Sequence, residues 1–196
     1  MRKNKRIILL ILLLASGSFL NAQQVKLIEG DLGSVRAEKT FNLEFRYDSL
    51  SVGKFHNEQD FVNKKIAERN KKHPGDGDAW AKTWVDQRKD AFEPRFTSEF
   101  ERSSGKKSSA SSKYTLVFHT TFIEPGFSTS GILIHKNPEI AGEIFVVETD
   151  NRSKIIARLA MEKVIGQAGS HFETGENLDG AYGEAGMLVG SFVNKN

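Results

Sequence analysis

The sequence predicts an α+β fold, in which a single mainly antiparallel sheet carries three helices on one face. Within residues 114–165, three stretches are rich in β-branched and aromatic residues and are separated by turn residues, which is typical of consecutive strands. Residues 41–47 alternate between apolar and polar side chains, a period that indicates a strand with one buried face. Residues 58–100 and 178–193 repeat apolar residues at helical spacing. The expected order of elements is therefore β-α-α-β-β-β-α.

The first 22 residues are interpreted as a secretory signal peptide. Four basic residues precede an unbroken run of isoleucine and leucine from Ile7 to Leu14, and the segment ends in Leu20-Asn21-Ala22. A membrane span needs about 20 apolar residues, so the run is too short for one. We expect cleavage after Ala22 and a periplasmic or secreted product without a stable membrane anchor. Lipid anchoring of the new N-terminus would need a cysteine, and the chain has none.

The remaining residues, 23–196, are expected to form a single α/β domain that begins with an irregular arm over residues 23–39. The whole chain has 28 basic and 25 acidic residues, but four of the basic ones belong to the first 22 residues, which hold no acid. The rest is therefore close to neutral, with 24 bases and 25 acids. A nucleic-acid footprint requires a sustained surplus of positive charge, so we expect no nucleic-acid partner.

The strand boundaries follow from turn residues. Residues 114–123, 139–149 and 154–162 are the three consecutive strands, and the polar residues 150–153 predict a short turn that joins the last two in an antiparallel hairpin. A further short strand is expected near residues 25–28 of the arm.

The helix boundaries follow from capping residues. Asn57 is expected to cap a helix that ends before Pro74, and Asp78 is expected to cap a second, longer one. Apolar rings recur every fourth residue along this second helix, with Arg88 filling one gap in the row, and Pro94 predicts a kink or break. The ring-bearing residues are Trp80, Trp84, Phe92, Phe96 and Phe100. We interpret the two tryptophans as core residues; a ligand-stacking platform is the alternative.

Two glycine- or serine-rich segments complete the chain. Residues 103–113 combine serine, glycine and three lysines, a composition that predicts a mobile surface loop. In the helix at 178–193, Gly183, Gly186 and Gly190 line one stripe, which predicts a close approach of this helix to the sheet.

The sequence assigns no catalytic, cofactor-binding or metal-binding residue. The histidines are not at zinc-ligand spacing; they are His56, His73, His119, His135 and His171. The stretch 126–130 nearly matches a nucleophilic-serine motif but has Ser130 where the motif requires glycine. Glu143 and Glu162 are expected on one face of the sheet, where a paired acid and base is conceivable. Strand glutamates more often face water, so we assign them no role.

Short motifs spread over residues 45–186 carry a family resemblance. They are Phe45-x-Tyr47 with Val52-Gly53-Lys54-Phe55, Gly77-x3-Ala81-x2-Trp84, Phe118-x-Thr-Thr-Phe-x-Glu-Pro-Gly126, Val147-Glu148-Thr149 and Ala181-Tyr182-x2-Ala185-Gly186. Together they resemble a group of small secreted α/β proteins of Bacteroidetes. The layout is loosely similar to envelope modules such as the N-terminal domain of TolB and outer-membrane accessory lipoproteins. That resemblance implies binding of protein partners without catalysis.

The sequence therefore predicts a non-catalytic envelope module that binds a protein partner through the wetter face or an edge strand of its sheet. Two alternatives stay open: a hydrolase of envelope polymers that uses glutamate and histidine on the open face, and a carrier with a small-ligand pocket between helices and sheet. Convergent carboxylates with perturbed pKa values would favour the enzyme. An unprotected apolar edge would favour the binding module.

Overall fold

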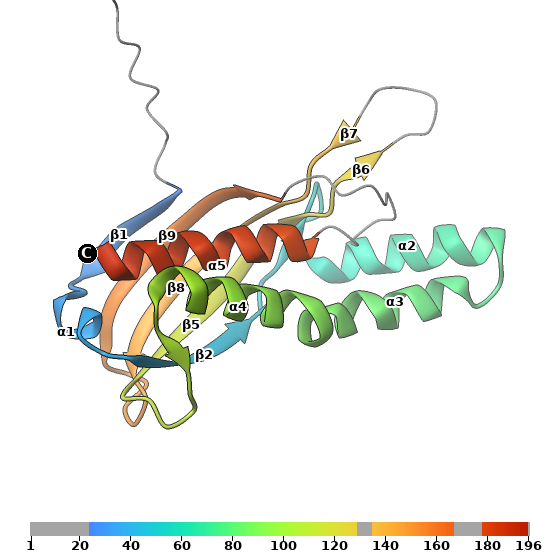
Figure 1. The fold of residues 1–196 in the computed structure, drawn as a ribbon. Helices are drawn as coiled ribbons and strands as arrows, with labels where there is room; N and C mark the ends of the chain where they lie inside the picture. The colour runs from blue at the N-terminus through green and yellow to red at the C-terminus, as the bar shows by residue number, and fades with distance from the viewer. Residues whose placement is uncertain (1–23, 129–134, 167–177, 196) are drawn as a thin grey trace, which may run out of the picture.

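The computed structural model describes residues 24–128, 135–166 and 178–195. One sheet is layered against helices (Figure 1). Its strands are β1 (Val25–Gly30), β2 (Thr40–Arg46), β3 (Ser51–Val52), β4 (Lys107–Ser108), β5 (Tyr114–Glu124), β8 (Glu139–Glu148) and β9 (Ile155–Ile165). A separate small hairpin is formed by β6 (Phe127–Ser128) and β7 (His135–Lys136). The segment interpreted as a signal peptide lies outside the described residues, so that interpretation stays a prediction.

The helices are α1 (Gly33–Arg36), α2 (Glu58–Lys72), α3 (Asp76–Gln87), the π-helical turn η1 (Arg88–Phe92), α4 (Glu93–Ser104) and α5 (Leu178–Lys195). The α4 and α5 helices lie side by side across one face of the sheet, whereas the α2–α3 pair extends past its end (Figure 1). The predicted α+β class is confirmed, whereas the order of the elements and the number of helices differ from the prediction. The long second helix proves to be three successive segments.

The strand order is β1-β9-β8-β5-β2-β4, with β3 pairing with β5 outside this path. The pairs β1/β9, β9/β8 and β8/β5 are antiparallel, which confirms the β8–β9 hairpin. However, β2 and β3 both run parallel to β5, so the sheet is mixed. The chain between β3 and β5 passes through α2, α3 and α4, and such a long helical connection lets the chain return as a parallel neighbour.

The N-terminal arm is more regular than expected. Its first residues form β1, which pairs with β9 over almost its whole length, and a single helical turn follows as α1. Leu32 and Val35 are fully buried at this turn. Burial of these two side chains explains why the arm folds onto the sheet although its local pattern is weak.

The core lies between the sheet and the α4–α5 layer. Phe41 contacts Phe100 edge-to-face at a centroid distance of 5.9 Å, and Phe96 stacks on Phe118 at 5.1 Å. Tyr182 of α5 is fully buried, and its hydroxyl lies 3.1 Å from the Thr120 hydroxyl on β5. Burial raises the pKa of Tyr182 above its usual range. The phenol therefore acts as a neutral hydrogen-bonding group within the core.

The glycine stripe of α5 faces α4, and the prediction that it faces the sheet is wrong. A Cβ added at Gly186 would overlap the backbone oxygen of Phe96, and one at Gly190 would crowd Phe100 and Ser103. Two helices can approach this closely only where one of them has glycine at the positions of contact. The glycines thus determine the spacing of the two helices that cover the sheet.

The break predicted at Pro94 is a π-helical turn just before the proline. The amide of Glu93 donates to the Arg88 carbonyl, five residues back, and Pro94 stands in the first turn of α4, where it needs no backbone donor. The extra residue in this turn interrupts the fourth-residue row of rings. Trp80 and Trp84 consequently pack in the α2–α3 pair, with ring centroids 5.9 and 5.2 Å from Phe61.

The segment 103–113 is not the mobile loop that its composition predicts. Its Lys107–Ser108 stretch pairs with β2 as strand β4. The side chain of Lys106 is buried, and its ammonium donates to the backbone oxygens of Arg36 and Glu38 at 2.6 Å each. Burial lowers the pKa of this ammonium. Tertiary contacts thus supply the partners that the local sequence lacks.

Candidate functional site

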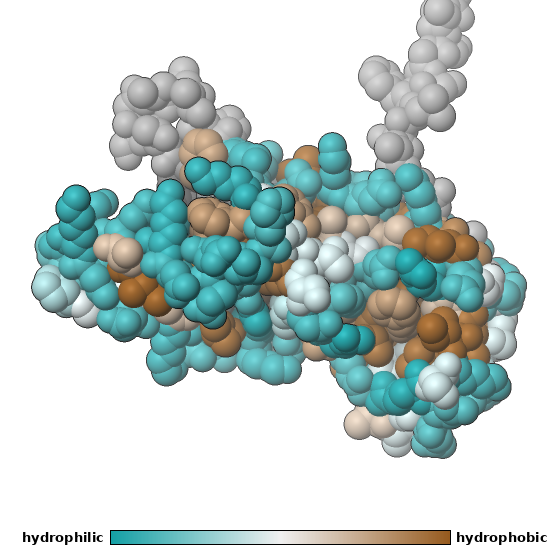
Figure 2. Space-filling view, turned by 180° about the vertical axis from the view of Figure 1, so that it is seen from behind, coloured by the Kyte–Doolittle hydropathy of each residue, from teal (hydrophilic) through white to brown (hydrophobic). Residues whose placement is uncertain are grey.

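The sheet face opposite the helices is the first candidate surface. Figure 2 looks from behind Figure 1, and apolar patches are visible on this side among polar residues. A shallow groove of about 530 Å³ is lined by Glu44, Arg46, Val117, Phe145, Val147, Arg152 and Ile155. Val117 and Val147 are largely covered, at 9% and 5% exposure, whereas Ile155 is 48% exposed. The face therefore combines an apolar centre with a charged border.

The charges on this border are paired with one another. The guanidinium of Arg152 donates to both oxygens of Glu44, at 2.9 and 2.7 Å. This bidentate pair lowers the pKa of Glu44, with Asn42 as a further donor. Arg46 likewise donates to both oxygens of Asp48 and lowers the pKa of that exposed carboxyl. A carboxyl held ionised in this way does not suit the role of a general acid.

The side chains that the sequence singled out are placed on this same face but not together in a site. His119 is adjacent to Arg46 in the β2–β5 register, and its Nε2 lies 2.7 Å from the backbone oxygen of Asp48. Glu143 accepts from Arg158 at 2.8 Å, and Glu162 lies 3.5 Å from the Lys26 ammonium. Each candidate carboxylate thus has its own cation.

The other residues considered add no site. Among the described strand glutamates, Glu124 and Glu148 pair with lysines. His56 and His73 are exposed in turns at the two ends of α2. His171 and Ser130 lie outside the described residues. In the described part of the chain, no three His, Cys, Asp or Glu side chains are grouped so that they could hold a metal ion. Nor is any described helix long and apolar enough to cross a membrane.

The outer edge of β1 is the second candidate surface. Leu27 is 43% exposed and Ile28 is 50% exposed. Ile28 is the extra residue of a bulge, because the register with β9 shifts between Leu27 and Glu29. Among the described strands, only β9 pairs with β1. This edge therefore presents apolar side chains beside backbone groups without a strand partner.

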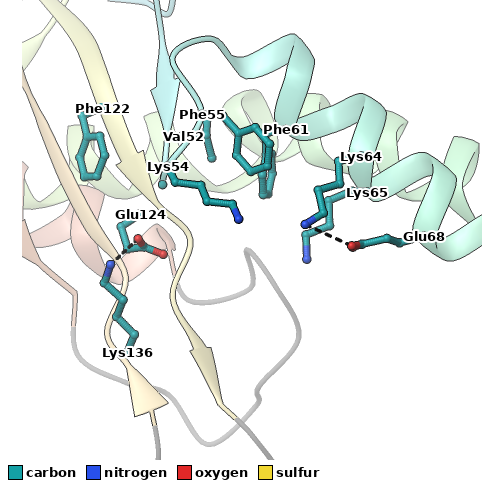
Figure 3. A pocket seen from close by; sticks show the side chains of 11 residues that line it. Val52, Lys54, Phe55, Phe61, Lys64, Lys65, Glu68, Phe122, Glu124 and Lys136 are labelled. Carbon is teal, nitrogen blue, oxygen red and sulfur yellow. Dashed lines mark hydrogen bonds and ion pairs between the residues drawn. The ribbon is translucent and has the colours of Figure 1, made fainter.

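A cleft beside α2 is the third candidate surface. It measures about 440 Å³ and is lined by Val52, Gly53, Lys54, Phe55, Phe61, Lys64, Lys65, Glu68, Phe122, Glu124 and Lys136. These residues come from the β3 turn, from α2, from the end of β5 and from β7 (Figure 3). Three aromatic rings and a valine provide apolar surface, and four lysines provide positive charge.

A polar cluster next to this cleft attaches the α2–α3 pair to the sheet. Glu58 at the start of α2 accepts from Trp84 Nε1 at 2.6 Å and forms an ion pair with Arg88. The Arg88 guanidinium lies 4.4 Å from the ring centroid of Tyr47, which directly follows β2. Burial raises the pKa of Tyr47. Arg88, which interrupts the aromatic row in the sequence, thus joins the α2–α3 pair to the sheet.

The sequence-based search missed the residues of the β1 edge and those of the cleft beside α2, which we call the lysine cleft. Lys54 and Phe55 follow a glycine in a short turn, and Lys64 and Lys65 precede Ile66 on a helix that looks merely amphipathic. The only local signal was Lys54 beside Phe55. Nothing in the sequence shows that these lysines converge, because they belong to separate elements.

Comparisons with known proteins give few matches. No protein-family model matches the chain, and no curated protein matches it. Among solved structures, a dodecamer of a PelC variant from Paraburkholderia phytofirmans is similar with a TM-score of 0.41 and 9% identity, over 86% of this chain and 97% of that one. A likeness this distant carries no argument about function.

Proposed function

We propose that this protein is a non-catalytic periplasmic or secreted module of the cell envelope, which binds a protein partner by adding an extended segment of that partner to the β1 edge. The supporting observation is the exposed apolar edge itself, with Leu27 and Ile28 at 43% and 50% exposure. Monomeric proteins usually protect such edges. A partner strand would cover both side chains and satisfy the free backbone groups.

The hydrogen-bond pattern of β1 identifies which amides are available. The Glu162 amide donates to the Gln24 carbonyl, so these two residues form a hydrogen-bonded pair. In an antiparallel ladder such pairs alternate with non-hydrogen-bonded ones. The groups of Val25 and Leu27 therefore point away from β9 and toward a potential partner. The bulge at Ile28 ends this regular stretch and leaves an apolar side chain as an anchor.

The alternatives receive less support. A hydrolase would need a carboxyl group with a raised pKa beside a second acid or base, whereas the groove holds one carboxyl, Glu44, whose pKa is lowered. A carrier with a ligand between helices and sheet would need space where Phe41, Phe96 and Tyr182 are fully buried.

Site-specific photo-crosslinking in the cell that produces the protein tests the proposal. A benzophenone amino acid at position 28 should give one adduct of defined mass. The same probe in place of Val85, which is 50% exposed on α3, should give none. The partner recovered from the adduct should then slow hydrogen exchange of the Leu27 amide and leave the amides of α3 unchanged.

Substitution of the edge supplies the quantitative control. Ile28→Lys should weaken binding of the purified partner on the order of tenfold, because it removes an apolar contact and places a charge on the edge. Val85→Lys should leave the affinity unchanged. Adducts at both positions would overturn the proposal, and so would protection of α3 in place of β1. An adduct with the mass of two copies of this chain would indicate that the β1 edge binds a second copy of the chain and not a different protein.

A further inference from the structure

The cleft beside α2 has the composition of a site for an amphipathic anion. Its lining contains four lysines and two glutamates, which gives a net charge of +2. Lys64 pairs with Glu68, and Lys136 pairs with Glu124. Among the described residues, Lys54 and Lys65 have no carboxylate partner. Two unneutralised cations at one cleft attract an anion.

The two unpaired lysines reach the cleft from different elements. Lys54 stands in the short turn after β3, and Lys65 stands on α2. In Figure 3 the Lys54 side chain extends into the space between α2 and the Glu124–Lys136 pair. The turn is fixed, because Val52 and Phe55 exchange backbone hydrogen bonds of 3.0 and 2.9 Å. An anion held between the two ammonium groups would therefore join α2 to the turn that follows β3.

The apolar part of the cleft lies next to these charges. Val52 is fully buried and Phe61 is 6% exposed, whereas Phe55 and Phe122 are half-buried. The ammonium groups of Lys54 and Lys64 each lie 5.9 Å from the Phe55 ring centroid. Charge and ring surface thus occur within one side-chain length of each other. A simple inorganic anion would leave the ring surface unused.

We propose that this cleft binds an amphipathic anion, meaning a single phosphate or carboxylate group joined to a short apolar chain or ring. The anionic group sits between Lys54 and Lys65, and the apolar part covers Phe55 and Phe122. The site is separate from the β1 edge, so this inference stands or falls independently of the proposed protein partner. A lipid headgroup with its acyl chain and a free amphiphile share this chemistry.

Isothermal titration calorimetry with octyl phosphate below its micelle concentration tests the site, with residues 23–196 as the protein. We expect saturable binding of one molecule per chain, which weakens as salt is raised. The double variant Lys54→Gln, Lys65→Gln should weaken binding by more than about tenfold, since each exposed charge contributes up to about fivefold. Octyl glucoside tests the apolar group alone, and inorganic phosphate tests the charge alone. Both should bind at least tenfold more weakly.

A matched variant separates a site from general electrostatics. Lys71→Gln, Lys72→Gln removes the same charge from the exposed end of α2, away from the cleft, and should leave the affinity unchanged. An equal loss in both double variants would overturn the proposal, and so would equal affinity for inorganic phosphate. Thermal melting of each variant verifies that it is folded.

Vesicles distinguish the two sources of the anion. Phosphatidylcholine vesicles with and without phosphatidylglycerol are sedimented with the protein and with both double variants. Binding to the anionic vesicles that requires Lys54 and Lys65 would support the cleft and assign the anion to a lipid. Octyl phosphate binding with the same requirement, but without vesicle binding, would support a free amphiphile. Vesicle binding that survives in the Lys54→Gln, Lys65→Gln variant, without octyl phosphate binding, would overturn the proposal.

Discussion

The two faces of the sheet are built from the same strands but are stabilised in different ways. On β5, Leu116 and Phe118 are fully buried against the helices, whereas His119, on the opposite face, is only partly covered. On the open face, apolar side chains are shielded by long charged ones: the Arg158 guanidinium lies 5.9 Å from the Phe145 ring centroid. Close packing therefore makes one face intolerant of substitution, and solvent-exposed pairing makes the other more tolerant.

Truncation of one phenylalanine on each face should show this difference most strongly. Phe118→Ala should lower the free energy of unfolding by about 3–5 kcal/mol, because it leaves a cavity among Phe45, Phe96 and Tyr182. Phe145→Ala should cost only about 1 kcal/mol, since solvent and the Arg158 side chain can fill the space. Urea denaturation measures both values. Equal losses would show that the open face is packed as a core.

The glycines of α5 offer a second comparison within the covered face. Gly186→Ala should destabilise the protein by about 1–3 kcal/mol, because its methyl group would meet the backbone of α4, which cannot move aside. At Gly183 the added methyl meets only the flexible side chain of Arg95. Gly183→Ala should therefore be neutral or stabilising by up to about 1 kcal/mol, as alanine favours helix. Thermal melting of the pair checks this, and the reverse ranking would contradict the helix–helix contact.

A buried hydrogen bond should contribute less than either packing change. Tyr182→Phe removes the hydroxyl that lies 3.1 Å from Thr120 and leaves the buried threonine unpaired. We expect a loss of about 1–2 kcal/mol. Combining it with Thr120→Val, which removes the unpaired hydroxyl, should recover part of the loss. Chemical denaturation of both single variants and of the double variant gives the coupling, and additive effects would argue against the bond.

The smallest effect is expected on the open face, and it should depend on pH. Arg152 lowers the pKa of Glu44 in the folded state below its ordinary value of 4.5. A depressed carboxyl pKa stabilises the fold above the unfolded pKa, and this contribution is lost as pH falls through the folded value. Because the pair is exposed, Glu44→Gln should cost at most about 0.5 kcal/mol at pH 7 and nothing near pH 2. Denaturation at both pH values measures it; a loss that persists at pH 2 would exclude the ion pair as its cause.

Local patterns predicted the type of most elements. The alternation of residues 41–47, the apolar runs of β5, β8 and β9 and the capping residue Asn57 all correspond to elements in the structure. The break before Pro94 was also predictable, because it depends on one residue and its own helix. Such features need only the period of the side chains and the covalent limits of proline.

The candidate sites could not be predicted in this way. Exposure of Ile28 depends on a bulge set by pairing with β9, which lies near the other end of the chain. The lysine cleft joins the turn after β3 to α2 and to β7, and each contributes an ordinary fragment of sequence. The burial of the Lys106 ammonium could not be predicted either, because the carbonyls that accept its hydrogen bonds, those of Arg36 and Glu38, lie far away in the sequence.

The amino-acid sequence by itself determined the type of the longer helices and strands and which side of each is apolar, because these properties depend on neighbours within a few residues. Only the tertiary structure decided that β2 runs parallel to β5, that the α5 glycines meet α4 and that the α2–α3 pair extends beyond the sheet. Each of these depends on contacts between segments far apart in the chain. Their free energies arise from packing and burial, which no local pattern encodes.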